Sequence, residues 1–177
     1  RSMHFASDNT AGASPKIAEA LLAANSGNAA AYGNDELTAA VEKRLSAVFE
    51  RDVAVFLVAT GTAANALSIA ALSPPWGAVF CHRESHLMVD ECGAPEFFSG
   101  AKLVGIAGEC GKLTPAAVEA TFDEFRPGFV HQVQPAVLSL TQATEAGTVY
   151  TPDEIAALVD VVRPRGLAVH MDGARFA

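Results

Sequence analysis

The chain has 177 residues, of which 50% are hydrophobic and 18% are charged, a composition that can bury a sizeable core and excludes disorder of the whole chain. Twelve Lys and Arg against twenty Asp and Glu give a net charge of −8, which argues against nucleic-acid binding through a basic face. The longest apolar run, Val53 to Ala59, is far shorter than the roughly 18 residues of a membrane-spanning helix, so we expect no membrane partner either.

The first residues and the cysteines bear on the origin and compartment of the chain. Residues 1–3, Arg-Ser-Met, resemble a cloning remnant, and no basic segment followed by an apolar run marks a secretory signal. Cys81, Cys92 and Cys110 are odd in number and irregularly spaced, which is typical of reduced thiols. We therefore expect a cytoplasmic protein.

The apolar pattern changes its period along the chain and predicts helices alternating with strands. Several helix starts show a capping residue followed by proline, and Thr151-Pro152 adds Glu154 to complete a capping box. Short valine-rich runs are typical of strands buried on both faces. In chain order we expect a helix after Ser14, a helix after Asp35, a strand at 53–59, a helix at 62–72, strands at 78–81 and 102–106, a helix after Thr114, one or two short strands within 130–140, a helix at 152–162 and a strand at 167–171.

This order of elements indicates βαβ units. We predict an α/β fold with a mostly parallel sheet and helices on both of its faces. We divide the chain into an N-terminal segment with the first helix, residues 4–35, and part of a larger domain, residues 36–177. The sequence stops directly after a buried-type strand and its polar turn, so we expect it to belong to a longer polypeptide.

The turn after the predicted strand at 53–59 is a candidate anion site. Gly61 permits a tight turn, Thr62 offers a hydroxyl, and the helix that follows presents free N–H groups and the positive end of its dipole. Such a helix start stabilises a phosphate ester. The alternative is an ordinary glycine turn in which Thr62 only caps the helix.

The turn after the last predicted strand is a second candidate. The apolar run ends in Asp172, and Arg175 follows three residues later. A carboxylate at the end of a buried strand needs a cationic or N–H partner, which makes a ligand site or a structural Asp172–Arg175 pair the two interpretations. The His170-x-Asp172 spacing also suggests a metal, but no second ligand cluster has convincing spacing, and we expect no metal site.

The histidines divide by their surroundings. His86 lies in a polar stretch after a strand, where it could face a ligand. His131 lies on a predicted apolar strand, where a structural role in the core is the default. Spacing alone assigns catalysis to neither.

Taken together, these segments resemble the N-terminal half of low-specificity L-threonine aldolases, pyridoxal-phosphate enzymes of the aspartate-aminotransferase fold. The matching segments appear in family order along nearly the whole chain. They are Ser7-Asp8, Gly27-Asn28, Tyr32-Gly33-Asn34-Asp35, Thr60-Gly61-Thr62-Ala63-Ala64-Asn65, His86 before Cys92-Gly93-Ala94, and His170-Met171-Asp172-Gly173-Ala174-Arg175.

The resemblance implies a large cofactor-binding domain and a set of site residues. It implies that pyridoxal 5′-phosphate is held by its phosphate at Gly61 and Thr62. Asp172 would keep the ring nitrogen protonated, so that the ring can act as an electron sink. The resemblance further implies that His86 stacks on the ring and moves a proton, and that His131 acts as an acid or base. It implies that Arg175 contacts the cofactor and binds the substrate carboxylate, and that Ser7 shares in binding this carboxylate.

The implied reaction is cleavage of a small β-hydroxy-α-amino acid to glycine and an aldehyde, with threonine giving acetaldehyde. The family usually has Glu-Asn-Thr in a segment that here reads Leu-Thr-Gln-Ala-Thr-Glu-Ala-Gly (140–147), which leaves threonine, allo-threonine, phenylserine-like substrates and β-elimination open. The resemblance also places the lysine that binds the cofactor covalently beyond Asp172, and none of the chain's four lysines matches it.

Two alternatives remain open at this stage. One is another pyridoxal-phosphate enzyme of the same fold, such as an aminotransferase or a β-eliminating lyase. The other is a module that binds the cofactor or an anion without turnover. The resemblance also implies a homo-oligomer, a dimer of dimers with active sites completed across an interface.

Overall fold

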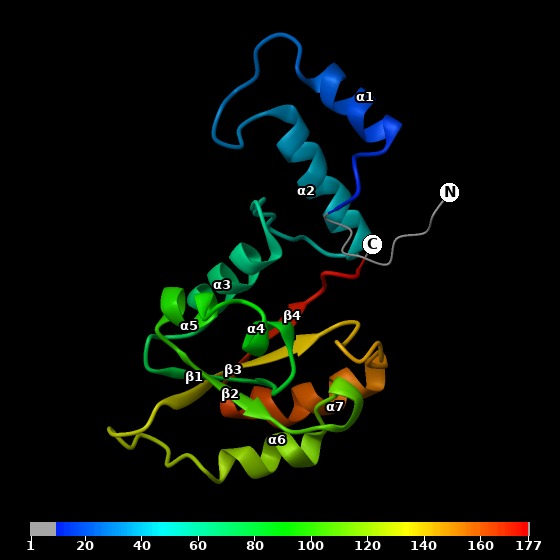
Figure 1. Ribbon diagram of the computed structural model, residues 1–177. Coiled ribbons are helices and arrows are strands. Elements are labelled where there is room, and N and C mark those ends of the chain that lie inside the picture. Colours follow the sequence, from blue (N-terminus) through cyan, green and yellow to red (C-terminus); the bar gives the residue numbers. More distant parts are fainter. Residues whose placement is uncertain (1–9, 177) are drawn as a thin grey trace. The chain divides into compact units, whose positions relative to one another are not determined.

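The computed structural model describes residues 10–176, which form two compact units that divide between Leu57 and Val58. The first unit contains helices α1 (Pro15–Ala24) and α2 (Glu36–Val48), and all other elements belong to the second unit (Figure 1). The boundary we predicted after residue 35 is not the division between these units. It stays a prediction about how the intact protein is organised.

Both helices of the first unit begin where the sequence predicts. Ser14 Oγ accepts a hydrogen bond from the Ile17 N–H at 3.4 Å, and Asp35 Oδ1 accepts one from the Thr38 N–H at 2.9 Å. These bonds satisfy N–H groups that have no partner within a helix. No residue of α1 or α2 is buried in the described unit, and most of their apolar side chains are exposed.

The prediction of a strand at residues 53–59 is wrong. These residues form no regular element, and Phe56 and Leu57 are 86% and 73% exposed. A strand needs a neighbouring strand for its backbone hydrogen bonds, and the four described strands pair only with one another. The valine-rich composition alone could not supply that partner.

The second unit is built on a parallel four-stranded sheet. Its strands are β1 (Gly77–His82), β2 (Lys102–Ile106), β3 (Gln134–Thr141) and β4 (Ala168–Asp172), in the order β2-β1-β3-β4. All three pairings are parallel, and Thr141 lies opposite Asp172 where β3 and β4 end. The predicted parallel sheet is confirmed.

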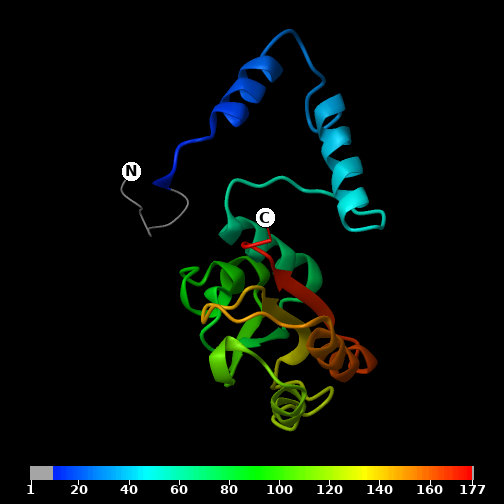
Figure 2. The same cartoon turned by 90° about the vertical axis from the view of Figure 1, so that its right-hand side faces the viewer.

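Helices cover both faces of this sheet, as predicted (Figures 1 and 2). The helices of this unit are α3 (Gly61–Leu72), α4 (His86–Val89), α5 (Ala94–Ser99), α6 (Pro115–Phe122), α7 (Pro152–Val162) and the one-turn 3₁₀ helices η2 (Glu109–Gly111) and η3 (Arg163–Arg165). Alternate residues of β1 point to opposite faces, with Phe80 in the core under α6 and α7 and Val79 in the core under α3. Among the described residues, no helix has both the length and the apolar composition needed to cross a membrane.

Proline shapes the start of β3. The pairing with β1 shifts between Ala78 and Val79, opposite Pro135 and Ala136, because proline has no N–H to donate to the sheet. The segment predicted as one or two strands is therefore a single strand that begins at Gln134. Residues 130–133 form a turn before it.

The strongest cap predicted from sequence is present at α7. Thr151 Oγ1 accepts a hydrogen bond from the Glu154 N–H at 3.2 Å, and Glu154 Oε2 accepts one from the Thr151 N–H at 2.7 Å. This is the reciprocal pair of a capping box.

We expect Thr151→Ala to lower the free energy of unfolding by about 1 kcal/mol, because it leaves the Glu154 N–H without its acceptor. Denaturant unfolding measures this change. Thr151→Ser, which keeps the hydroxyl, is the matched control and should stay close to the wild type. Equal loss in both variants would contradict the capping role.

Candidate active site

The start of α3 lies at the carboxyl edge of the sheet and presents unpaired donors. Thr60, and not Thr62, caps this helix, since Thr60 Oγ1 accepts from the Ala63 N–H at 3.1 Å. The interpretation of Thr62 as an ordinary cap is therefore wrong. Within residues 10–176 the N–H groups of Gly61 and Thr62 have no hydrogen-bond partner, and a Cβ placed on Gly61 would meet nothing within 4 Å. Two unpaired donors thus lie at the positive end of the helix dipole.

Asp172 lies close to that helix start. Its Oδ2 accepts a hydrogen bond from Asn65 Nδ2 at 2.9 Å, and its Oδ1 accepts one from the Ala174 N–H at 3.0 Å. Asn65 follows Thr62 by three residues of α3, a rise of about 4.5 Å. The structure therefore brings the predicted phosphate donors and the predicted ring partner to one side of the sheet, within reach of a single small cofactor.

A second polar chain leads from Asn65 to His86. Glu91 Oε1 accepts from Asn65 Nδ2 at 2.6 Å and contacts His86 Nδ1 at 3.0 Å. Glu91 is only 3% exposed and Asn65 only 5%. Sequence reasoning assigned no role to either residue. The signals available were an asparagine inside an otherwise apolar helix and a glutamate five residues after His86.

The ligand atoms of His86, Glu91 and Asp172 lie within 4.8 Å of one another, a spacing compatible with a metal ion. The Asn65 amide nitrogen, however, donates to both carboxylates. A cation placed between them would face the positive hydrogens of that amide. In the structure, the two carboxylates of this cluster are joined by a hydrogen-bond donor.

Arg175 belongs to the same edge. Its Nη1 donates to the Ala143 carbonyl at 3.0 Å, and the described residues contain no ion pair between Arg175 and Asp172. The structural Asp172–Arg175 pair considered above is therefore not formed. Arg175 is exposed, with guanidinium donors left for an anionic ligand.

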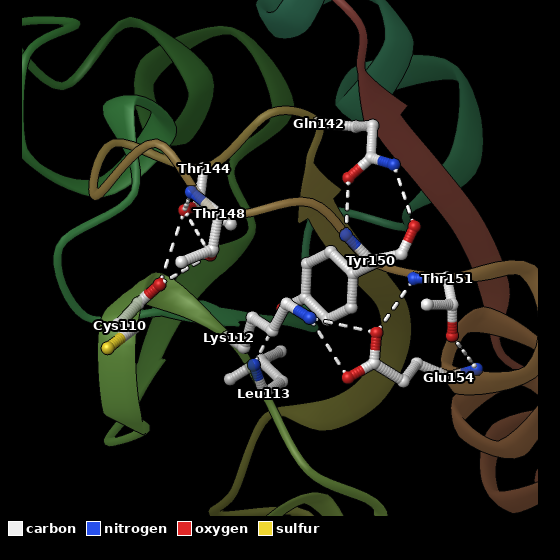
Figure 3. Close-up of polar contacts among 9 residues, drawn as sticks. All are labelled: Cys110, Lys112, Leu113, Gln142, Thr144, Thr148, Tyr150, Thr151 and Glu154. Carbon is white, nitrogen blue, oxygen red and sulfur yellow. Dashed lines mark hydrogen bonds and ion pairs between the residues drawn. The ribbon is translucent and has the colours of Figure 1, made fainter.

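The segment that departs from the threonine aldolase pattern forms a fixed loop after β3. The Gln142 side chain pairs with the backbone of Tyr150, with Nε2 donating to the carbonyl and Oε1 accepting from the N–H, both at 2.9 Å (Figure 3). Thr148 Oγ1 donates to the Cys110 carbonyl at 2.7 Å. The loop also carries Glu145, whose Oε1 accepts from the His86 N–H at 2.9 Å. Glu145 thus holds the backbone of His86, and Ala143 of the same loop holds the side chain of Arg175.

His131 is not brought to this site. It is exposed in the turn before β3, and its ring packs edge-on against Phe129 at 5.2 Å, so the expected core role is wrong. Asp172 lies level with the other end of β3. The eight residues of β3 are separated by seven steps of about 3.3 Å, which put roughly 23 Å between these two edges of the sheet. Ser7 lies outside the described residues.

His170 lies two residues before Asp172 and is 8% exposed, with Nδ1 at 2.9 Å from Ser139 Oγ on the neighbouring strand. Burial lowers the pKa of the His170 imidazole, and the nearby carboxylates of Asp172 and Glu91 oppose that shift more weakly. The fold therefore favours the neutral form of the His170 imidazole.

The shift predicts a pH dependence of stability. In the unfolded chain the histidine has its ordinary pKa of about 6.5. Below that pH the unfolded state binds a proton more readily than the folded state does. The free energy of unfolding should therefore fall as the pH drops below about 6.5 towards the lower folded pKa. Urea titrations at several pH values should show a steeper fall for the wild type than for His170→Asn. The same fall in both proteins would contradict the buried neutral imidazole.

The chain is similar to known enzymes over nearly its whole length. The family model described as beta-eliminating lyase matches residues 4–177. The chain is 46% identical over 174 residues to the low specificity L-threonine aldolase of Pseudomonas aeruginosa, covering 98% of the chain and 50% of that protein. It is 43% identical over 178 residues to the corresponding enzyme of a Pseudomonas species, covering 100% of the chain and 51% of the relative.

A solved structure supports the same assignment. The threonine aldolase of Leishmania major superposes with a TM-score of 0.88 at 30% identity, covering 94% of this chain and 48% of the other. The chain thus spans about half the length of the relatives it matches, and the resemblance to threonine aldolases found in the sequence is confirmed. The chain belongs to the beta-eliminating lyase family.

Proposed function

We propose that this chain supplies most of the cofactor site of a pyridoxal-phosphate-dependent lyase that cleaves small β-hydroxy-α-amino acids, threonine or allo-threonine among them, to glycine and an aldehyde. One observation carries the proposal. The unpaired N–H groups at the start of α3 and the Asp172 carboxylate are linked through Asn65, about one helical turn apart. The similarity to low specificity L-threonine aldolases supports this choice of reaction.

The chemistry of the donor set fits the cofactor. The N–H groups of Gly61 and Thr62 suit a phosphate dianion, and Asp172 suits a protonated ring nitrogen. When bound, the cofactor supplies an electron sink for the pair of electrons left by Cα–Cβ cleavage. The lysine that binds it covalently is expected in the part of the relatives' length that this chain does not span.

The residues of the chain bind and orient the substrate. Arg175 would hold the α-carboxylate, with its guanidinium positioned by the Ala143 carbonyl. His86 would stack on the cofactor ring and take the proton of the β-hydroxyl, whose loss drives the cleavage. Ser7 would share the carboxylate contact.

The position of His131 bears on assembly. Because it lies at the opposite edge of the sheet from Asp172, its proposed acid or base role would be performed in the site of a second copy. We therefore propose a homo-oligomer, a dimer of dimers. We also propose that it acts on a small molecule and that it is located in the cytoplasm.

The reaction assay uses the intact protein with pyridoxal 5′-phosphate and either L-threonine or L-allo-threonine. We expect glycine and acetaldehyde in equal amounts. Formation of an α-keto acid with ammonia would indicate β-elimination instead, and an α-keto acid formed only with an amino acceptor would indicate an aminotransferase. Either result without glycine would overturn the aldolase proposal.

A further inference from the structure

We infer that Glu91 is a positioning residue, which fixes the tautomer and orientation of His86 and, through Asn65, the side chain of Asp172. The roles of His86 and Asp172 in this inference are those of the proposed function. The action of Glu91 on these two residues is inferred from the geometry of their contacts.

Glu91 occupies a position where a carboxylate is costly. It lies between α4 and α5, and its side chain has no exposed surface. Its Oε2 has no hydrogen-bond partner among the described residues. An apolar side chain of similar size would fill this space without the desolvation cost, so packing does not explain a glutamate here.

The contacts on Oε1 define the tautomer of His86. Asn65 Nδ2 donates one hydrogen to this oxygen at 2.6 Å, so Oε1 acts as an acceptor. The second contact, at 3.0 Å, is with His86 Nδ1, which must then carry the ring hydrogen. The neutral imidazole is left with a bare Nε2, the atom that can accept a proton.

The same carboxylate also orients Asp172. The Asn65 amide nitrogen has two hydrogens, one used by Glu91 Oε1 and the other by Asp172 Oδ2. The bond to Glu91 therefore fixes the rotation of the amide, and the amide with the Ala174 N–H fixes the plane of the Asp172 carboxylate. His86 and Asp172 come from distant parts of the sequence, and Glu91 with Asn65 joins them into one unit.

The test measures the His86 tautomer by ¹⁵N NMR of histidine-labelled intact protein, at about pH 8.5, where an ordinary imidazole is neutral. Loss of the His86 signal in His86→Asn assigns the signal. We expect the Nδ1–H form in the wild type and in Glu91→Gln, which keeps an oxygen acceptor. Glu91→Leu should shift the ring towards the Nε2–H form. Glu84→Leu, which removes a nearby exposed carboxylate, should change nothing.

Kinetics give a second readout. We expect Glu91→Leu to lower kcat for aldol cleavage about 10- to 100-fold, the effect of losing a hydrogen bond to a charged group, and Glu91→Gln to lower it much less. A wild-type Nε2–H form, or the same tautomer in wild type and Glu91→Leu, would overturn the inference. If Glu91→Leu does not fold, the tautomer of His86 in the wild type still tests the inference, because the Nε2–H form there would overturn it. An intact protein with the Nδ1–H form but no glycine release would overturn the proposed function while supporting the positioning of His86 by Glu91.

Discussion

Asp172→Asn is expected to lower kcat for cleavage of L-threonine by roughly 10²- to 10³-fold, the cost of removing one aligned electrostatic partner from an active site. The carboxylate would hold a proton on the ring nitrogen of the bound cofactor, and an amide carries no charge to do so. The new amide would also lie beside the Asn65 amide, whose Nδ2 now donates to Oδ2 at 2.9 Å. Steady-state kinetics with saturating cofactor measure the change.

Asp160→Asn is the matched control, because Asp160 lies exposed on α7. It should leave kcat unchanged, and both variants should keep the circular dichroism spectrum of the wild type. An Asp172→Asn protein with at least half the wild-type kcat would remove Asp172 from the proposed chemistry.

Phe80→Ala is expected to lower the free energy of unfolding by about 3–5 kcal/mol. Phe80 is completely buried in the middle of β1. Its ring lies edge-on to Phe122 at 5.1 Å and tilted against Phe125 at 5.6 Å, so truncation removes both ring contacts and leaves a cavity between the sheet and α6. Urea unfolding followed by circular dichroism measures the loss.

The control for this change is Phe97→Ala on α5, where the same side chain is 81% exposed. Its effect should stay within about 0.5 kcal/mol, as is usual for surface positions. If the two alanine variants were equally stable, the core under α6 and α7 would not be packed as described.

Local signals in the sequence predicted the helices well. The caps at Ser14, Asp35, Thr114 and Thr151 each depend on a side chain and an N–H three residues away, so the chemistry can be recognised within one turn. α4 and α5 were not predicted, because helices of four and six residues are too short to show an apolar period.

Interactions between distant residues were harder to predict. The segment 53–59 has the composition of a strand but finds no pairing partner among the described residues. The sequence singles out Asp172 and His86 individually. The hydrogen bonds that connect them run through Asn65, which is 107 residues from Asp172 and 26 residues from Glu91 in the sequence. No spacing within the sequence reveals such a contact.

The most direct test of the proposed cofactor site is a crystal structure of the intact protein with pyridoxal 5′-phosphate. We expect phosphate oxygens that accept hydrogen bonds from the N–H groups of Gly61 and Thr62, with the ring nitrogen at hydrogen-bond distance from Asp172. A cofactor whose phosphate binds at another edge of the sheet, or whose ring nitrogen points away from Asp172, would contradict it.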